Sequence, residues 1–585
     1  MLLKKLLVML LALCFLGGLG TSGAFAVSAD GELRDPAFSA PVTIEVFNPG
    51  ASMSGEQPGW FGKYVKDRWN MTFNIISAEG DANAKFQTLA ASGNLGDLVV
   101  FTSPGQEFQQ AMAAGLLYDL SKDDAFARNM LYFAEHFPVA IGRMTGKFNN
   151  GEEGAMYGIP TRVSMESPTL SQNASEVDYG IMIRYDYYLG AGAPELNTFE
   201  DLIGALAAMK EKYPQTEDGK VTYGASIHNG MDNAAGIAHA QTLFGIYGYQ
   251  ALTGDSIVFV DNMAKEYQHV LQDGSLYFRG LRFFYELNQR GLLDPDSLTQ
   301  NGNDASEKFR AGSVFYSNWY WEAKNAFNNM EHVSAGIGYV MAPLKDQKIS
   351  STGFSPGGTN GPVLALGKDG READRILNFL DWSFTPEGVM TLYNGPEGLT
   401  FTYNADGHPV LTDFGKQALP QNKVDVPEEW GGSNFADGFQ RLSLYPLSNA
   451  ETGLFGEAYK YANWSSTLAG AMSNLDKIWS EHMGGARYTK EYLVMNDMLS
   501  VIPGNTYTAP AMSTDMRTIR DQIGNIIKQY SWQMIFAKDD AEYEAIKETM
   551  IEMANDLGYE ELLAHYLALR PELEAARQAS VDSVK

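Results

Sequence analysis

Hydrophobic and polar positions alternate in short runs along the first part of the chain, and stretches of helical periodicity separate these runs. Val42–Phe47 and Thr72–Ile76 have the alternation of strands, and Leu98–Phe101 is an apolar run typical of a buried strand. The segments between them, Trp60–Trp69 and Ala84–Ala91, have the spacing of helices. Strands that alternate with helices predict a mostly parallel sheet, in which ligands bind beyond the carboxyl ends of the strands.

A second α/β stretch follows the first. It opens with the apolar run Gly180–Arg184 and continues through a helix at Leu202–Lys212. Residues 515–575 are strongly helical, with apolar stripes at helical spacing. The pattern therefore predicts an α/β protein with a helical C-terminal region. The loops at 48–55 and 102–107 follow predicted strands, so both are candidates for a ligand cleft.

The first 26 residues have the pattern of a signal peptide, which is removed from the mature chain. Lys4 and Lys5 precede the apolar run Leu6–Leu16, and Ala24–Ala26 has the form of a cleavage site. The run is shorter than the roughly 20 residues that a membrane span needs. Cys14, the single cysteine, follows a leucine where a lipid-anchoring site has a small residue. We therefore expect an exported, extracellular or periplasmic chain without a lipid anchor.

Charge and composition narrow the class of partner. The formal net charge is −28, and removal of the two leader lysines lowers it to −30. This balance argues against nucleic acid or an anionic membrane, since both require clustered Lys and Arg. A neutral or cationic small ligand remains open, although acidity also simply keeps an exported protein soluble. The mature chain has no cysteine, so two to four hydrophobic cores must stabilise it without disulfides.

Motifs for catalysis and metal binding are weak. Gly353–Gly357 matches the spacing of a serine nucleophile elbow, but Pro356 lacks the N–H that the oxyanion hole needs, so we interpret it as a turn. The eight histidines lack zinc-site spacing, and Asn301–Asp304 and Asn404–Gly407 have too few carboxylates for calcium. We expect no catalytic residue, no metal and no cofactor. A carboxylate pair of a glycosidase stays numerically open.

The aromatic stretch Ser317–Trp321, with the sequence SNWYW, is the remaining signal. An indole face can receive the C–H face of a sugar ring while nearby polar groups bind its hydroxyls. Trp319 and Trp321 would point the same way from an extended segment and would diverge if a helix began at once. For any one tryptophan, residues alone favour packing in the core over ligand binding.

Short motifs run in order through almost the whole mature chain. They are Ala90–Asp97, Gly115–Leu120, Met156–Pro160, Ile183–Tyr188, Asn197–Leu202, Gly291–Ser297, Phe309–Gly312, Asn378–Trp382 and Gly395–Gly398. Together they resemble the extracellular solute-binding proteins of ABC importers, in the large branch related to maltodextrin- and oligosaccharide-binding proteins. The chain departs from this pattern at Gly96, where proline is usual, and at Pro214–Lys220, which lacks the calcium loop of some relatives.

The resemblance implies a two-lobed periplasmic-binding-protein-like fold of the class II type, with the ligand in a cleft between lobes that close by a hinge. It divides the chain into a signal peptide and four segments. These are 1–26 for the signal peptide, 41–165 for the first lobe, 166–345 for the second lobe, 346–400 for the return to the first lobe, and 401–585 for the completion of the second lobe and the C-terminal helices.

The resemblance also nominates ligand contacts, and it favours a binding role for Trp319. Trp319 and Trp321 would supply the stacking face. The other candidates are Arg162, Ser103, Gln106 and Asn48 as polar contacts, and Trp430 on the late part of the second lobe.

We therefore expect a monomeric binding protein, not an enzyme, that captures an oligosaccharide and delivers it to ABC transporter permease subunits. A binder of peptides or another small solute and a secreted carbohydrate-active enzyme are the alternatives.

Overall fold

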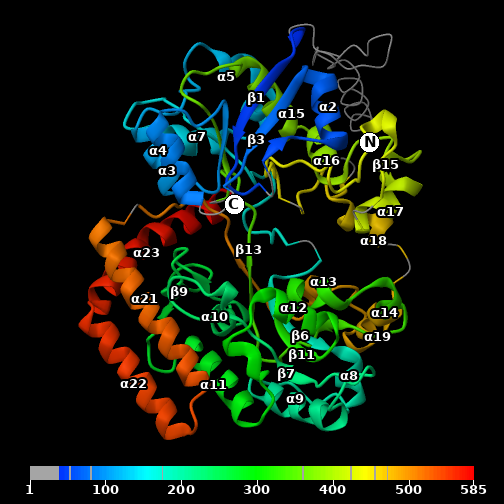
Figure 1. Cartoon of the computed structure of the whole chain (residues 1–585), viewed down its shortest axis with the longest axis vertical. Coiled ribbons are helices and arrows are strands. Elements are labelled where there is room, and N and C mark those ends of the chain that lie inside the picture. Colours follow the sequence, from blue (N-terminus) through cyan, green and yellow to red (C-terminus); the bar gives the residue numbers. More distant parts are fainter. Residues whose placement is uncertain are drawn as a thin grey trace, which may run out of the picture.

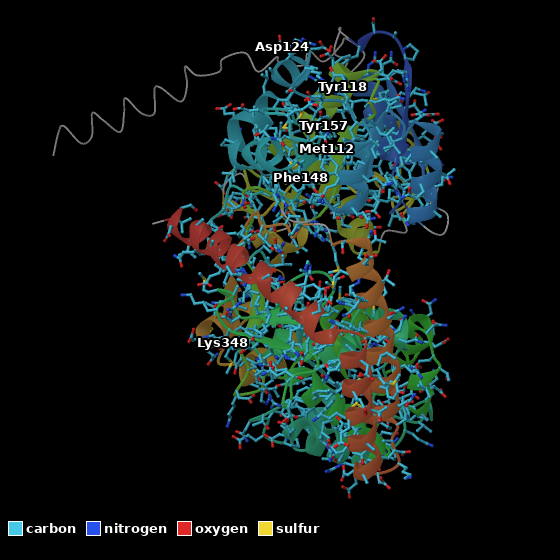
Figure 2. The ribbon with its side chains drawn as sticks, turned by 90° about the vertical axis from the view of Figure 1, so that its left-hand side faces the viewer. Met112, Tyr118, Asp124, Phe148, Tyr157 and Lys348 are labelled. Atoms are coloured by element: carbon cyan, nitrogen blue, oxygen red, sulfur yellow. The ribbon has the colours of Figure 1, made fainter. Side chains whose placement is uncertain are left out.

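Two large hydrophobic cores divide the molecule into two lobes, and a smaller third cluster lies among elements of the second lobe (Figure 1). The computed structural model describes residues 38–584 except 52–53, 79–81, 174, 359–360, 422–423, 449, 454–455, 469, 471 and 511. The first core draws its residues from 38–163 and 363–464, and the second from 181–344 and 475–573. Viewed at 90° to Figure 1, Tyr118 and Phe148 lie in the upper lobe and Lys348 in the lower (Figure 2). The predicted signal peptide lies outside the described residues.

The first lobe is built on a six-stranded sheet of order β2-β3-β1-β4-β14-β5. β1 pairs in parallel with β3 and β4, as the alternation of strands and helices predicts. β14 arrives from the distant return segment and pairs antiparallel with β4 and β5. The strands are β1 (Val42–Phe47), β2 (Gly55–Glu56), β3 (Met71–Ile76), β4 (Leu98–Phe101), β5 (Ile159–Pro160) and β14 (Val363–Leu366).

Helices cover both faces of this sheet, and a hairpin extends the lobe. The helices are α2 (Gly59–Trp69), α3 (Ala82–Ser92), α4 (Gln106–Ala113), α5 (Ala125–Asn129), α6 (Leu131–His136), α7 (Pro138–Lys147), α15 (Ala373–Phe384), α16 (Pro386–Asn394), α17 (Asp413–Gln421) and α18 (Ser465–Leu468), and the hairpin is β15 (Phe401–Tyr403) with β16 (Pro409–Leu411).

Gly96 shows why the chain departs, before β4, from the motif that it resembles. Its φ is +98°, a conformation that L side chains rarely adopt, and a Cβ there would lie 2.9 Å from the carbonyl oxygen of Glu45. The glycine lets the chain enter β4 tightly against β1. Leu98–Phe101 is buried at every position, in agreement with the predicted buried strand.

The second lobe contains a four-stranded sheet of order β12-β6-β11-β7 and a smaller antiparallel sheet of order β10-β9-β8. Its elements are β6 (Tyr179–Arg184), β7 (Tyr223–Ala225), β8 (Gln250–Ala251), β9 (Val258–Val260), β10 (Tyr267–His269), β11 (Val314–Trp319), β12 (Tyr339–Met341), α8 (Tyr185–Gly190), α9 (Asp201–Lys212), α10 (Ala238–Ile246), α11 (Leu276–Gln289), α12 (Gly302–Arg310), α13 (Tyr320–Phe327), α14 (Met330–Ser334), α19 (Asn474–His482) and α20 (Thr489–Met495).

Three long C-terminal helices pack on the second core, as the helical pattern of residues 515–575 predicts. They are α21 (Thr514–Ile535), α22 (Asp540–Asp556) and α23 (Tyr559–Asp582). Between the lobes, β13 (Ile349–Thr352) pairs in parallel with β17 (Leu499–Ile502) (Figure 1). Among the helices that the structure describes, none combines the length and apolar character that a membrane crossing requires.

The boundary at residue 401 differs from our prediction. We assigned 401–585 to the second lobe, whereas the hydrophobic side chains between Phe401 and Trp464 pack in the first core. Phe435 stacks on Trp60 of α2, with ring centroids 5.7 Å apart, and Trp464 contacts Phe401 edge to face. The chain enters the second core again at Leu475. These long-range ring contacts leave no local signal in the sequence.

Candidate functional site

The aromatic pair, Trp319 and Trp321, lies where β11 passes into α13. β11 is buried at all six positions and lies between β6 and β7, with an irregularity in its pairing between Ser317 and Trp319. Trp319 keeps an extended backbone, and the helix begins at Tyr320. The two indole rings nevertheless stack, with centroids 5.4 Å apart and planes 24° apart.

The members of the aromatic pair differ in exposure. Trp319 is 5% exposed and Trp321 is 38% exposed. The inner indole therefore packs into the lobe and supports the outer indole, whose face reaches solvent. Such a surface can take up the flat side of a ligand ring.

Polar groups hold the inner indole from behind. The ring of His239 lies 4.6 Å from that of Trp319. Asn318 donates a hydrogen bond of 2.6 Å from Nδ2 to the carbonyl oxygen of His239, which ties β11 to α10. Ser317 donates from Oγ to the Glu322 carboxylate in the first turn of α13. The turn that carries the aromatic pair is thus fixed to two neighbouring elements.

His228, His239 and Glu322 form the group among the described residues that could hold a metal ion, with ligand atoms within 4.8 Å of one another. Backbone N–H groups already use one lone pair of each imidazole. Gly230 donates to His228 Nδ1 at 3.1 Å, and the backbone N–H of His228 donates to His239 Nε2 at 3.3 Å.

These bonds let the cluster support the aromatic pair from behind. With Nδ1 accepting, the N–H of His228 lies on Nε2, 3.4 Å from Glu322 Oε1. A metal ion bound by both imidazoles would have to break a backbone bond or displace a ring proton. Burial lowers the pKa of His239 to about 4, so this ring is neutral near pH 7.

The nominated polar residues of the first lobe are Asn48, Ser103, Gln106 and Arg162, and the structure does not bring all of them together. Asn48 is 1% exposed, and its Nδ2 donates to Arg441 O at 2.7 Å and to Ser443 Oγ at 3.1 Å. Its side chain therefore shapes the end of β1. Ser103 is half-buried after β4, and its Oγ accepts from the backbone of Gly105.

Arg162 is exposed, and its backbone has a φ of 53°, in the left-handed region. Its guanidinium lies 5.9 Å from the ring centroid of Tyr445, whose carbonyl oxygen accepts from the Arg162 backbone at 3.0 Å. Tyr445 is 41% exposed. The 441–447 segment thus joins Asn48 and Arg162 on one side of the first lobe, and sequence reasoning missed it because these contacts span almost 400 and 300 residues.

Gln106 opens α4, and its Oε1 accepts a hydrogen bond of 2.6 Å from Arg517 of α21. The residue lines a cavity of about 630 Å³ that α4 shares with α21 and α23. Figure 1 shows α4 above these C-terminal helices. Gln106 therefore contacts the helical region rather than another nominated residue.

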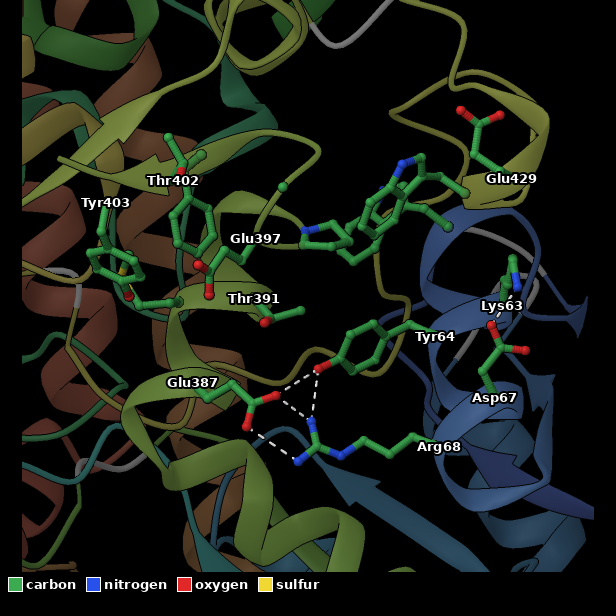
Figure 3. A pocket seen from close by; sticks show the side chains of 16 residues that line it. Lys63, Tyr64, Asp67, Arg68, Glu387, Thr391, Glu397, Thr402, Tyr403 and Glu429 are labelled. Carbon is green, nitrogen blue, oxygen red and sulfur yellow. Dashed lines mark hydrogen bonds and ion pairs between the residues drawn. The ribbon is translucent and has the colours of Figure 1, made fainter. Parts of the chain in front are cut away.

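Trp430 lies in the first lobe, where we had expected the second. It packs against the first core and lines a cavity of about 910 Å³, here called the lobe-1 cavity (Figure 3). The cavity lies between α2, α16, β15 and the 3-10 turn η4 (Glu428–Trp430). Of the nominated residues, the structure therefore pairs Trp319 with Trp321 and links Asn48 with Arg162, but it places Gln106 and Trp430 elsewhere.

Comparison with known proteins identifies the relatives of this chain. The family model of the bacterial extracellular solute-binding protein matches residues 60–416. The lipoprotein LipO of Bacillus subtilis (strain 168) is 22% identical over 404 residues, which cover 67% of this chain and 71% of LipO.

Two solved structures resemble the fold. The ABC-transporter substrate binding protein FusA of S. pneumoniae in complex with kestose has a TM-score of 0.61 at 15% identity, over 92% of this chain and all of FusA. The alginate-binding protein AlgQ2 without calcium ion has a TM-score of 0.57 at 15% identity, over 95% of this chain and 99% of AlgQ2. This likeness shows the two-lobed α/β fold that the sequence motifs imply.

Proposed function

Because the chain belongs to the bacterial extracellular solute-binding proteins, we propose that it captures a carbohydrate, an oligosaccharide in the first instance, at the aromatic pair. The stacked indoles carry this proposal. Trp321 presents a face to solvent, and the buried ring of Trp319 holds it in place. An aromatic face fixed in this way matches the weakly polar face of a pyranose or furanose ring.

Polar groups of the first lobe would complete the site when the lobes approach each other. The exposed guanidinium of Arg162, with Tyr445 beside it, can donate to sugar hydroxyls or to the carboxylate of an acidic sugar. Ser103 follows β4 and offers a hydroxyl. A ligand that contacts both lobes would stabilise the closed state, since binding shifts the equilibrium by its differential affinity for the two states.

We propose delivery to the permease of an ABC transporter by a monomer that does no chemistry of its own. FusA is described as an ABC-transporter substrate binding protein, and its fold is similar to that of this chain. LipO is a lipoprotein by name, which speaks against our expectation that the mature chain lacks a lipid, so we do not retain that expectation.

The direct test is calorimetry of the mature protein against panels of neutral oligosaccharides, acidic oligosaccharides and peptides. We expect saturable binding of one saccharide class and its loss in Trp321→Ala. Tyr267→Ala is a matched control, since Tyr267 is also 38% exposed on the second lobe but lies on β10. Binding of peptides alone, or equal loss in both variants, would reject the proposal, and release of shorter saccharides on incubation would favour an enzyme.

A further inference from the structure

The lobe-1 cavity is a second candidate binding site, separate from the aromatic pair. It encloses about 910 Å³ within the first lobe, a volume in the range of small-molecule sites. One face of α2 forms a wall, with Trp60, Tyr64 and Arg68 at helical spacing, and α16, β15 and η4 form the others. We propose that this cavity binds a small organic cation, a protonated or quaternary amine.

Aromatic side chains supply the walls on which a cation can lie. Trp60 is buried against Phe435, with planes 14° apart, and supports the wall from behind. Trp430 is half-buried and covers Gly398, where an added Cβ would lie 3.7 Å from its ring. Tyr64 and Tyr403 line the cavity from α2 and β15. Electron-rich ring faces attract ammonium groups, and more strongly when the site is shielded from water.

Arg68, which lines one end of the cavity, already lies against aromatic rings behind the wall. Its guanidinium lies 5.1 Å from the ring of Trp69 and 5.3 Å from that of Trp382. It donates to Tyr64 Oη at 2.8 Å and to Glu387, as the dashed lines of Figure 3 show. Arg68 and Glu387 are therefore paired with each other at this end, and a ligand cation would bind toward Glu397 and Glu429.

Two of the carboxylates that line the cavity have no paired cation among the described residues. Lys63 forms an ion pair with Asp67, and Arg68 with Glu387. Among the described residues, no cationic side chain pairs with Glu397 or Glu429, and both are exposed at the cavity. Figure 3 shows the Glu397 carboxylate between Tyr403 and Thr391. An anion would be repelled here, whereas an amine would gain attraction from the aromatic walls and from a carboxylate without a paired cation.

The aromatic pair lies on the other lobe, where the adjacent carboxylate of Glu322 is buried and accepts from Ser317 beside the imidazole of His228, so we expect the two sites to select different ligands. The cation site is independent of the carbohydrate site and would survive its rejection.

Choline and its neutral isostere 3,3-dimethylbutan-1-ol provide a matched pair of probes, since they differ in the charge of one atom. Titration of the mature protein with each, followed by ligand-observed NMR and calorimetry, measures the contribution of charge. We expect saturable binding of choline and affinity for the alcohol at least about tenfold weaker. Equal affinity for both probes, or no saturation by choline, would overturn the proposal.

Variants test whether choline binds in the lobe-1 cavity. Glu397→Gln should weaken choline binding about fivefold or more, whereas Glu135→Gln, which removes the same charge from the exposed face of α6, should leave it unchanged. Circular dichroism checks that both variants fold. Equal losses would indicate long-range attraction by the acidic protein and reject a built site. Trp321→Ala should leave choline binding intact, and its loss there would move the cation to the aromatic pair and also reject the proposal.

Discussion

The aromatic pair of the second lobe and the lobe-1 cavity both present tryptophan faces, but their polar surroundings differ. Behind Trp319 stand a neutral imidazole, an amide and a hydroxyl, all hydrogen-bonded within the protein. Around Trp430 stand carboxylates that outnumber the cations. An indole therefore does not set the class of ligand by itself. The groups beside it decide whether its face suits a neutral ring or a cation.

The largest expected effect distinguishes the buried indole of Trp319 from the exposed indole of Trp321 that it supports. Trp319→Ala should lower the free energy of unfolding by about 4 kcal/mol, because the ring is almost fully buried and its removal leaves a cavity. Trp321→Ala should cost about 1 kcal/mol or less. Urea denaturation followed by circular dichroism measures both changes. Equal losses would mean that the two rings share one role.

The neutral imidazole behind Trp319 should make the second lobe sensitive to acid. The pKa of His239 is about 4 in the folded protein, below the ordinary value near 6.5, because the ring is buried. Between pH 6.5 and pH 4 the unfolded chain therefore binds a proton that the folded chain does not. The contribution of His239 to the free energy of unfolding should fall by up to about 3 kcal/mol as pH decreases through this window.

Denaturation at several pH values checks this slope, and His239→Gln isolates the imidazole. The variant should lose the component between pH 6.5 and pH 4 while keeping contributions from other buried groups. One such group is Glu451, whose pKa burial raises to about 7 and which acts in the opposite direction between pH 4.5 and pH 7. An unchanged slope in the variant would assign the effect to a group other than His239.

A smaller effect tests the outer ring as a ligand surface. Trp321→Ala should weaken binding of the preferred saccharide about tenfold, equivalent to about 1.4 kcal/mol, because the stacking face is lost while the fold remains. Isothermal calorimetry gives the ratio of dissociation constants. A ratio near one would place the carbohydrate away from the aromatic pair.

The smallest expected effect tests the difference in charge between the lobe-1 cavity and the aromatic pair. Lys63→Ala removes the partner of Asp67 on the surface of α2 and should lower stability by about 0.5 kcal/mol. The same change makes the lobe-1 cavity more negative, so choline affinity should rise about twofold. Carbohydrate affinity should stay constant, and NMR titration with calorimetry covers both ligands. A fall in choline affinity would contradict the electrostatic account.

Local patterns were enough to predict much of the fold. The predicted strand at Leu98–Phe101 agrees with β4, and the helix predicted at 60–69 agrees with α2 within one residue, because hydrophobic periodicity is a property of adjacent positions. The assignment of 401–464 was different, since that segment is held by rings such as Phe435 against Trp60. A contact of this kind depends on the tertiary arrangement, which periodicity does not encode.

The candidate site was less accessible to sequence reasoning than the fold. The nomination of Trp319 and Trp321 rested on a local motif together with the family resemblance, and the structure stacks the two rings although a helix begins between them. Tyr445 was missed because its neighbour in space, Arg162, is far away in sequence. His228 and His239 gave no signal either, since they lie eleven positions apart and no familiar spacing marks them.

The contact between Gln106 and Arg517 has a consequence for how the molecule moves. α21 belongs to the second core, yet it holds the start of α4, and Lys147 of the first lobe donates to Thr508 just before α21. Rotation of the two lobes about this contact would keep these hydrogen bonds, whereas separation of the lobes at the contact would break them. The C-terminal helices would then lie at the pivot of the motion, and a solute would enter from the side remote from α21.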